Sequence, residues 1–424
     1  MTIHVVRAGE TLPSIAEHYG VDPARLASDN SVPPDGALAV GQTLVIRFPR
    51  VVHAVQSGET LTTIAGRYST TVRALWRNNF FLGGGSQIYP GQALVISYFG
   101  EKLGTAAANG YAYPHISPAL LNETLPYLTY LAPFTYGITA EGNLLPLADD
   151  LLLAAARERG TKPVMHLSTL TEEGSFDTQR ATMVLTERSP QDRLVEQILQ
   201  TLLYRGYAGL DVDFEYIPGD LAAAYAAFLD RLRRLLHARG LFLWAALAPK
   251  TSASQRGLLY EGHDYAAVAA ATDGVLLMTY EWGYTYGPPM AVAPLPNVRA
   301  VLDYAVTVIP PEKIFLGVPN YGYDWPLPFR QGVTRARSIS NQEAIRIAIA
   351  HRIAIQFDET AVSPFFHYTA QDGTVHEVWF EDARSMEAKL RLIAEYGFQG
   401  CGFWNLMRPF SQTWLTLDSL YDVD

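Results

Sequence analysis

The chain has 424 residues, 49% of them hydrophobic and 17% charged, a balance typical of a soluble globular protein with two or three domains. Its formal charge of -10 argues against a nucleic-acid partner, because proteins that bind phosphates need clustered Lys and Arg. No apolar run is long enough to span a bilayer, and the N-terminus lacks the basic start and apolar core of a secretory signal, so no membrane contact is expected. The one cysteine, Cys401, has apolar neighbours and is predicted to be a buried structural thiol.

An internal repeat occupies the first 98 residues. The segment HVVRAGETL, which begins at His4, recurs 49 residues later as HAVQSGETL from His53. After one inserted residue, GQTLVI from Gly41 matches GQALVI from Gly91. Each copy reads as strand, helix, helix, strand, with the threonine of Gly-Glu-Thr able to cap the first helix. The pattern resembles the lysin motif (LysM), a domain that binds N-acetylglucosamine polymers in a shallow groove between its loops. The resemblance implies LysM domains at 1–49 and 50–98; a duplicated structural spacer is the alternative.

The rest of the chain is predicted to be an α/β domain. Residues 99–110 are rich in small residues and are predicted to be a linker. From Tyr111 onward short apolar strands alternate with amphipathic helical stretches, which indicates parallel βα units and, with eight strands, a closed (β/α)8 TIM barrel over 111–424. The strands are expected near 111–116, 127–138, 163–169, 208–216, 241–249, 274–282, 313–322 and 400–406. The stretch from about 326 to 383 is too long for one loop, so we expect a small α+β insertion that walls one side of a cleft.

The segment GLDVDFEY at 209–216 carries the chemistry. Because side chains alternate along a strand, Asp211, Asp213 and Glu215 share one face, while their apolar neighbours face the other way. Mutual repulsion favours a protonated group among three such carboxylates, as a proton-transfer role requires. Glu215 is the last of the three before a loop, which in a barrel places it in the cleft. The alternative is an acidic strand end that faces solvent or binds metal, but no paired histidines accompany these residues.

This segment resembles glycoside hydrolase family 18. The family carries Asp-x-x-Asp-x-Asp-x-Glu at the end of the fourth barrel strand, and Ala208 stands here in place of the first Asp. Met278-Thr279-Tyr280-Glu281 is similar to the sixth-strand signature with Glu in place of Asp, and Gly317–Gly322 resembles the seventh strand. The third-strand segment MHLSTL lacks the usual Ser-x-Gly-Gly. Together with the two LysM copies, TYLAPFTYG and GYDWPLPF are similar to the spore-germination, cortical-fragment lytic N-acetylglucosaminidases.

The resemblance implies a retaining mechanism in which the substrate supplies its own nucleophile. The 2-acetamido oxygen attacks C1 while Glu215 protonates the leaving oxygen, Asp213 orients the acetamido N–H, and Asp211 holds Asp213 and shares its proton. Tyr280 is implied to hydrogen-bond the acetamido oxygen, and Trp404 to form the aromatic floor under the sugar. Weaker candidates for substrate contacts are Glu281, Trp282, Asn320, Tyr321, Tyr323 and Trp325.

The predicted partner is peptidoglycan or another N-acetylglucosamine polymer, and no cofactor or metal is predicted. His4 and His53 occupy the same place in both repeats and are expected to pack or cap. The resemblance places the protein at the spore coat and cortex or the cell wall, although no signal peptide is recognisable. Two alternatives remain: a chitinase of the same fold, and a glycan-binding protein without activity.

Overall fold

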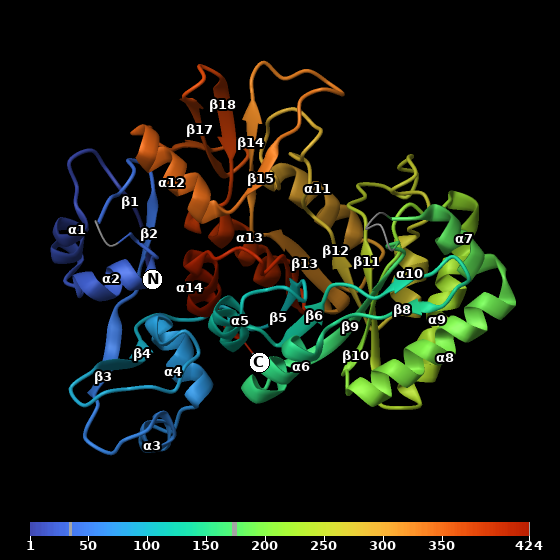
Figure 1. Ribbon diagram of the computed structural model, residues 1–424, viewed down its shortest axis with the longest axis horizontal. Helices are drawn as coiled ribbons and strands as arrows, with labels where there is room; N and C mark the ends of the chain where they lie inside the picture. The colour runs from blue at the N-terminus through green and yellow to red at the C-terminus, as the bar shows by residue number, and fades with distance from the viewer. Residues whose placement is uncertain (34–35, 172–175, 424) are drawn as a thin grey trace.

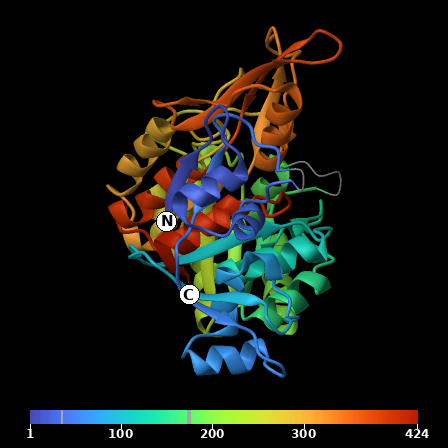
Figure 2. The same cartoon turned by 90° about the vertical axis from the view of Figure 1, so that its left-hand side faces the viewer.

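The computed structural model describes residues 1–33, 36–171 and 176–423. Two small modules lie beside a barrel, and a lobe with its own sheet lies above the barrel in the view of Figure 1. Turned by 90°, the second module extends below the rest of the molecule, and the first lies between it and the lobe (Figure 2). No helix among the described residues is long and apolar enough to cross a membrane.

Each module consists of an antiparallel strand pair and two helices, as predicted. The first contains β1 (Thr2–Val5), α1 (Leu12–Tyr19), α2 (Pro23–Asp29) and β2 (Thr43–Ile46). The second contains β3 (Pro49–Ala54), α3 (Leu61–Arg67), α4 (Val72–Asn78), the 3-10 turn η1 (Phe80–Leu82) and β4 (Ala93–Tyr98). Thr11 and Thr60 cap the first helix of each copy with a reciprocal capping box.

The repeated polar residues are structural. His4 lies 3.2 Å from the hydroxyl of Tyr19 and 3.0 Å from a carboxylate oxygen of Glu10, and His53 makes the same two contacts in the second copy. The expectation that both histidines pack is therefore confirmed. Asn30 fastens α2 to β2: its side chain donates to the carbonyl of Val45 at 3.0 Å and accepts from the Val45 amide at 2.7 Å.

Eight parallel strands close the barrel. In spatial order they are β5 (Gly104–Ala112), β6 (Tyr130–Pro133), β9 (Lys162–Ser168), β10 (Gly209–Asp213), β11 (Phe242–Leu247), β12 (Gly274–Leu277), β13 (Ile314–Pro319) and β19 (Gly400–Trp404). β19 pairs with β5 and completes the ring, which confirms the predicted fold class. A further short strand, β20 (Tyr421–Val423), pairs with the beginning of β5. Buried Cys401 lies in β19, as expected of a structural thiol.

Helices surround the ring and bury apolar stripes against it. They are α5 (Pro118–Thr124), η2 (Leu125–Tyr127), α6 (Asp150–Arg159), α7 (Thr178–Thr186), α8 (Arg188–Arg205), η3 (Gly219–Leu221), α9 (Ala222–His237), α10 (Tyr265–Ala271), α11 (Leu295–Ala305), η4 (Pro311–Lys313), α13 (Ala383–Tyr396) and α14 (Ser411–Leu420). A two-stranded ribbon, β7 (Gly137–Ile138) and β8 (Leu144–Leu145), follows β6. The main core between helices and strands includes Leu194, Ile198 and Leu202 of α8, all fully buried.

The first barrel strand corrects the predicted linker at 99–110. β5 begins at Gly104, so most of the segment FGEKLGTAAANG is strand and the connection is confined to 99–103. The residues of β5 are small because little space is left where β5 and β19 meet to close the barrel. A Cβ on Gly400 of β19 would lie 1.9 Å from the carbonyl oxygen of Ala107, and Ala107 faces a cluster that contains the rings of Trp244 and Phe315.

The predicted α+β insertion is present and begins earlier than expected. Its antiparallel sheet has the order β15 (Arg337–Ile339), β14 (Gly322–Pro326), β18 (Val375–Trp379), β17 (Ser363–Thr369) and β16 (Gln356–Asp358). The helix α12 (Asn341–His351) packs against this sheet. Because β14 starts only three residues after β13 ends, the lobe is fixed directly to the end of a barrel strand.

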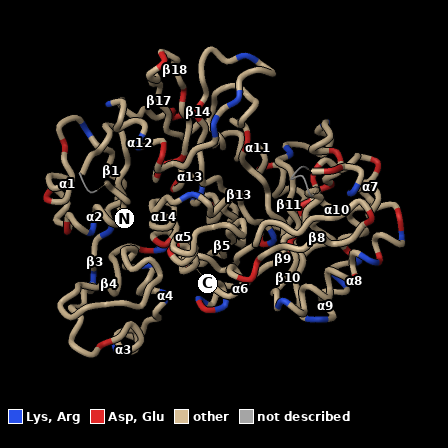
Figure 3. Tube along the Cα trace, in the orientation of Figure 1, with Lys and Arg blue, Asp and Glu red and all other residues tan. Residues whose placement is uncertain are grey.

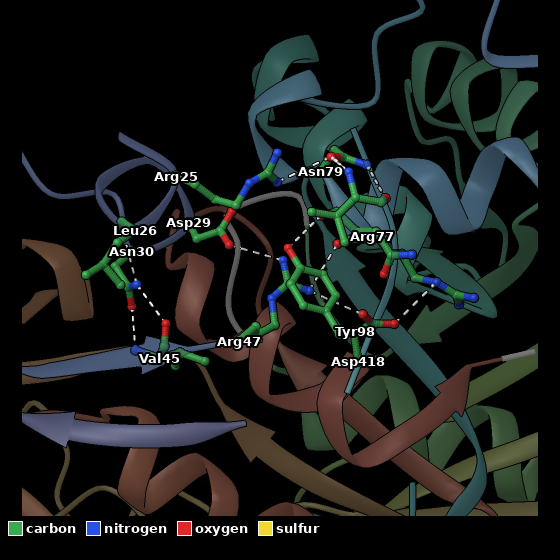
Figure 4. A network of polar contacts seen from close by, with 12 residues as sticks. Arg25, Leu26, Asp29, Asn30, Val45, Arg47, Arg77, Asn79, Tyr98 and Asp418 are labelled. Carbon is green, nitrogen blue, oxygen red and sulfur yellow. Dashed lines mark hydrogen bonds and ion pairs between the residues drawn. The ribbon is translucent and has the colours of Figure 1, made fainter. Parts of the chain in front are cut away.

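A buried arginine joins both modules to the barrel. Arg47, which follows β2, lies 3.3 Å from Asp29 of α2 and 3.5 Å from Asp418 of α14 (Figure 4). Its guanidinium also stacks on Tyr98 of β4, 4.1 Å from the ring centroid. Arg77 of α4 adds a second contact to Asp418 at 3.5 Å. Since a buried charge must be paired, these groups hold the two modules and the barrel in a fixed arrangement.

Candidate active site

A cavity of about 460 Å³ opens at the carboxyl ends of the barrel strands. Asp213 and Glu215 of the acidic row meet there with three of the predicted aromatic residues, Tyr280, Trp282 and Trp404, as expected for a barrel of this kind. The cavity is lined by Tyr113, Phe134, Leu170, Phe176, Asp213, Glu215, Pro249, Leu259, Tyr260, Met278, Tyr280, Glu281, Trp282 and Trp404. Most of these side chains are apolar or aromatic, so the few polar groups stand in a largely apolar lining.

Strand β10 and the residues just after it carry the acidic row. Leu210, Val212 and Phe214 are fully buried on one side, while Asp211, Asp213 and Glu215 alternate with them. The exposure of the carboxylates increases along the row: Asp211 is fully buried, Asp213 is 5% exposed and Glu215 is half-buried. The row therefore leads from the barrel core into the cavity, and Glu215 lies at its open end.

Burial shifts both aspartates toward their protonated forms. Burial raises the pKa of Asp211 to about 6, even though the hydroxyl of Tyr111 donates to its Oδ2 at 2.8 Å. Burial, then the charges of Glu215 and Asp211, raise the pKa of Asp213. Each aspartate has one oxygen, Oδ1, with no hydrogen-bond partner within the described part of the chain. A proton held between the two aspartates removes the repulsion that two buried charges would cause.

Glu215 is poised as a proton donor. Burial and then the neighbouring charge of Glu281 raise its pKa to about 7. At neutral pH a substantial fraction of the carboxyl group is therefore protonated, as general acid catalysis requires. This environment supports the catalytic role that the sequence predicts for Glu215.

Tyr280 and Trp404 both reach the cavity, as predicted. Burial raises the pKa of Tyr280, so its hydroxyl keeps its proton and is available as a donor. Trp404 ends β19, and its ring lies 4.7 Å from that of Phe134 and 5.8 Å from that of Tyr111. These contacts fix the indole as one wall of the cavity.

Glu281 and Trp282 also line the cavity. Glu281 has φ 67°, which is uncommon for a residue other than glycine, and its carboxylate is held in place by two phenols. The hydroxyl of Tyr323 donates to it at 3.0 Å, and that of Tyr321 makes a shorter hydrogen bond. Tyr321 and Tyr323 are therefore neighbours of a cavity residue and do not line the cavity themselves.

Two predicted substrate contacts are corrected by the structure. Trp325 is fully buried in the insertion, where its indole N–H donates to the carbonyl of Gly287 at 2.8 Å. Asn320 is 1% exposed and ties the end of β13 to the following loops, donating to the carbonyl of Arg408 at 2.9 Å. Both side chains have a packing role.

His166 on β9 is a residue of the site that was not predicted from the sequence. Its Nε2 lies 3.6 Å from Asp213 Oδ2, and its Nδ1 lies 2.7 Å from the hydroxyl of Thr135. Burial lowers the pKa of His166 to about 3, so the imidazole is neutral. His166 lies in the segment MHLSTL, where the sequence departs from the pattern expected of the third strand. That departure was the feature of the sequence from which an altered residue at the site could have been predicted.

The sequence and the fold were compared with known proteins. Residues 171–408 match the domain described as glycosyl hydrolases family 18, and residues 4–47 and 53–97 match the LysM domain. The cortical fragment-lytic enzyme of Bacillus subtilis (strain 168) is 39% identical over 431 residues, covering 100% of this chain and 99% of that protein. The crystal structure of the spore cortex-lytic enzyme SleL from Bacillus megaterium has 34% identity and a TM-score of 0.84, covering 100% of this chain and 98% of that one. A chitinase from Chromobacterium violaceum has 26% identity and a TM-score of 0.69, covering 74% of this chain and 98% of its own.

The matched region contains the site described above. Residues 171–408 include the whole acidic row, and the barrel brings Asp213, Glu215, Tyr280 and Trp404 of this region to one cavity. The full-length agreement extends the likeness through both LysM domains and the insertion. The chain is a glycoside hydrolase with two LysM domains, and it belongs to glycosyl hydrolases family 18.

Proposed function

We propose that the protein is an N-acetylglucosaminidase that cleaves the glycosidic bond after N-acetylglucosamine in spore-cortex peptidoglycan or its fragments during germination. The observation that carries this proposal is the acidic row that ends at Glu215 inside an aromatic cavity. The full-length likeness to enzymes named for cortical fragments supports the choice of substrate. Basic and acidic residues are interspersed along the chain (Figure 3), which fits a substrate recognised by shape and hydrogen bonds more than by charge.

The first step breaks the bond without a protein nucleophile. The sugar lies against Trp404, and its 2-acetamido oxygen attacks C1 as the bond from C1 to the leaving oxygen breaks. Glu215 gives its proton to that oxygen, for which a pKa of about 7 is well suited. The product is an oxazolinium ion on the sugar and a carboxylate on Glu215.

Asp213 stabilises the positive charge that develops on the acetamido group. It accepts the acetamido N–H, and the hydroxyl of Tyr280 donates to the acetamido oxygen, which orients that oxygen toward C1. As the charge develops, the shared proton moves to Asp211 and leaves Asp213 ionised. Tyr111 holds Asp211 through its hydrogen bond at 2.8 Å, and the neutral imidazole of His166 lies beside Asp213, 3.6 Å from its Oδ2.

The second step restores the enzyme. Glu215, now a carboxylate, takes a proton from water, which attacks C1 from the face that the leaving group vacated. The oxazolinium opens, the acetamido group returns to its ordinary form, and the configuration at C1 is retained. The same residue thus acts as acid in the first step and as base in the second.

The region of the two LysM domains is proposed to hold the same polymer outside the cavity. We place their boundaries at 1–49 and 50–98, and the protein at the spore coat and cortex or the cell wall. Binding there raises the local concentration of glycan at the cavity, because the second contact becomes intramolecular.

Digestion of purified spore-cortex peptidoglycan tests the proposal. Wild-type protein and Glu215→Gln are compared, and the reduced products are identified by mass spectrometry. Fragments that end in reducing N-acetylglucosamine from the wild type alone support the proposed bond, while ends in a muramic residue mean that a different bond is cut. Cleavage of chitin oligomers without cortex products favours a chitinase, to which the chitinase relative points. Binding without products from either polymer leaves a glycan-binding protein.

A further inference from the structure

The two LysM domains present equivalent loops in different surroundings. We call residues 38–41 and 88–91 the closing loops, because each leads into the last strand of its domain. In the first domain Gly41 donates to the carbonyl of Val6 at 2.8 Å, and in the second Gly91 donates to that of Val55 at 2.8 Å. The two glycines have φ 84° and 86°, so the backbones of the two loops correspond closely at this point.

In the first domain the insertion covers Ala39 and Gly41 of the closing loop, and Val40 between them stays exposed. The amide of Ile355 donates to the carbonyl of Val40 at 2.8 Å, and a Cβ on Gly41 would lie 1.9 Å from the carbonyl oxygen of Ile355. Ala39 is 4% exposed and belongs to the same apolar cluster as Phe366 of β17. In Figure 1 the first domain lies next to α12 of the insertion.

In the second domain the closing loop is open. Tyr89, which corresponds to Ala39, is 58% exposed, and a Cβ on Gly91 would meet nothing within 4 Å. The domain is instead held through α4 and the turn after it: Arg73 donates to the carbonyl of Pro126 at 2.9 Å, and Gly84 packs on Asn122. The face that carries the loop is therefore not used for contact with the barrel.

The open face has the chemistry of a site for a neutral glycan. The closing loop, Ile88-Tyr89-Pro90-Gly91, contains no charged residue, and neither does the neighbouring stretch Gln56-Ser57-Gly58. The two segments meet where the amide of Val55 donates to the carbonyl of Gln92 at 2.9 Å. An exposed phenol ring among uncharged groups can stack on the apolar face of a sugar and donate to its hydroxyl groups.

We infer that the second LysM domain holds the N-acetylglucosamine-containing glycan strand, and that the first is a fixed support of the insertion. This inference rests on the proposed function for the identity of the glycan. It divides the repeat into one binding domain and one structural domain, although their sequences and folds correspond. The insertion in turn carries Tyr323, which holds Glu281 at the cavity, so the first domain supports one wall of the site.

Retention on insoluble polymer tests this division. Tyr89→Ala and Val40→Ala are made in full-length Glu215→Gln, which prevents digestion, and binding to purified cortex peptidoglycan and to chitin is measured. Val40 is the control, since it is the exposed residue of the first closing loop, with 41% of its surface accessible. Tyr89→Ala is expected to weaken retention by about fivefold or more, and Val40→Ala to leave it unchanged. Equal losses, or wild-type retention by Tyr89→Ala, would overturn the inference.

Gly41 and Gly91 provide a second, independent pair of variants that tests the inference. Gly41→Ala and Gly91→Ala place the same side chain at the same backbone angle, but only the first meets the insertion. Gly41→Ala is expected to lower the melting temperature by several degrees more than Gly91→Ala. Equal decreases would mean that the insertion does not depend on the first domain. Cleavage of soluble fragments is measured separately on the wild type, so a protein that binds but does not cleave contradicts the proposed activity alone.

Discussion

Replacing Glu281 by Gln is expected to move the alkaline limb of the pH profile to lower pH. Glu215 must be protonated for the first step, and activity is lost as the pH rises through its pKa of about 7. Part of that elevated pKa comes from the negative charge of Glu281. Glutamine keeps the size of the side chain and an oxygen that can accept from Tyr323, but it removes the charge.

The structure limits the size of this effect. The pKa of Glu215 rises from an ordinary value of 4.5 to about 7, and burial is the larger of the two causes. The charge of Glu281 therefore accounts for less than half of the increase, or roughly 1 pH unit at most. The limb of Glu281→Gln should lie between about 6 and the wild-type position near 7.

The assay is the pH dependence of kcat/KM with a soluble cortex fragment, which reports groups of the free enzyme. Glu395→Gln is the control, because it removes one carboxylate from a surface ion pair with Arg299 and does not touch the cavity. Its limb should coincide with that of the wild type. An alkaline limb of Glu281→Gln that is unchanged or moved to higher pH would refute the reasoning about Glu215.

Three further changes have expected outcomes. Glu215→Gln should melt at a higher temperature than the wild type at pH 8 but not at pH 4.5. Because the pKa of Glu215 is raised in the folded state, the wild-type protein loses folding stability as the pH rises from 4.5 to about 7, and glutamine does not titrate. Equal melting curves at pH 8 would contradict this. Tyr111→Phe leaves Asp211 without its hydrogen bond and should cost about 1–3 kcal/mol of unfolding free energy and lower kcat, checked by urea titration and steady-state kinetics. Arg47→Met leaves buried Asp29 without its ion-pair partner and should cost about 3–5 kcal/mol in urea titration, a loss under 1 kcal/mol being incompatible with the network of Figure 4.

The acidic row was predictable because it depends on local geometry alone. The alternation of side chains is a property of any strand, so the spacing of Asp211, Asp213 and Glu215 determines their common side without knowledge of neighbouring strands. The strand itself ends at Asp213, and Glu215 follows it into the cavity. The apolar residues between them supplied the contrast that made the pattern visible.

The alternation of polar and apolar residues that identified β10 is missing in β5. Its residues are glycine, alanine and threonine up to Asn109, which differ little in hydropathy, so the segment resembled a linker. Their small size follows from the closure of the ring against Gly400, a partner almost 300 residues away in the sequence. Local patterns cannot show a constraint that arises only when two distant strands meet.

The errors around the cavity have a similar origin. His166 is opposite Asp211 in the register of β9 and β10, and a single sequence does not specify the register between neighbouring strands. Trp325 was included among the candidate substrate contacts because of its position near the end of a predicted barrel strand. Tyr323 and Trp325 share a face of β14, yet Trp325 lies deep in the insertion and only Tyr323 reaches Glu281.

The closure of β5 against β19 also sets an order of events during synthesis. On the ribosome, β5 emerges directly after the LysM domains, whereas its partner at the seam follows only after most of the remaining chain. At about 5–20 residues per second, one edge of β5 stays unpaired for roughly 15–60 seconds. A stretch of alanine and glycine is poorly suited to pair with other chains during that wait, because it offers little apolar surface and low strand propensity. The composition that makes the seam fit thus also protects the nascent chain from aggregation.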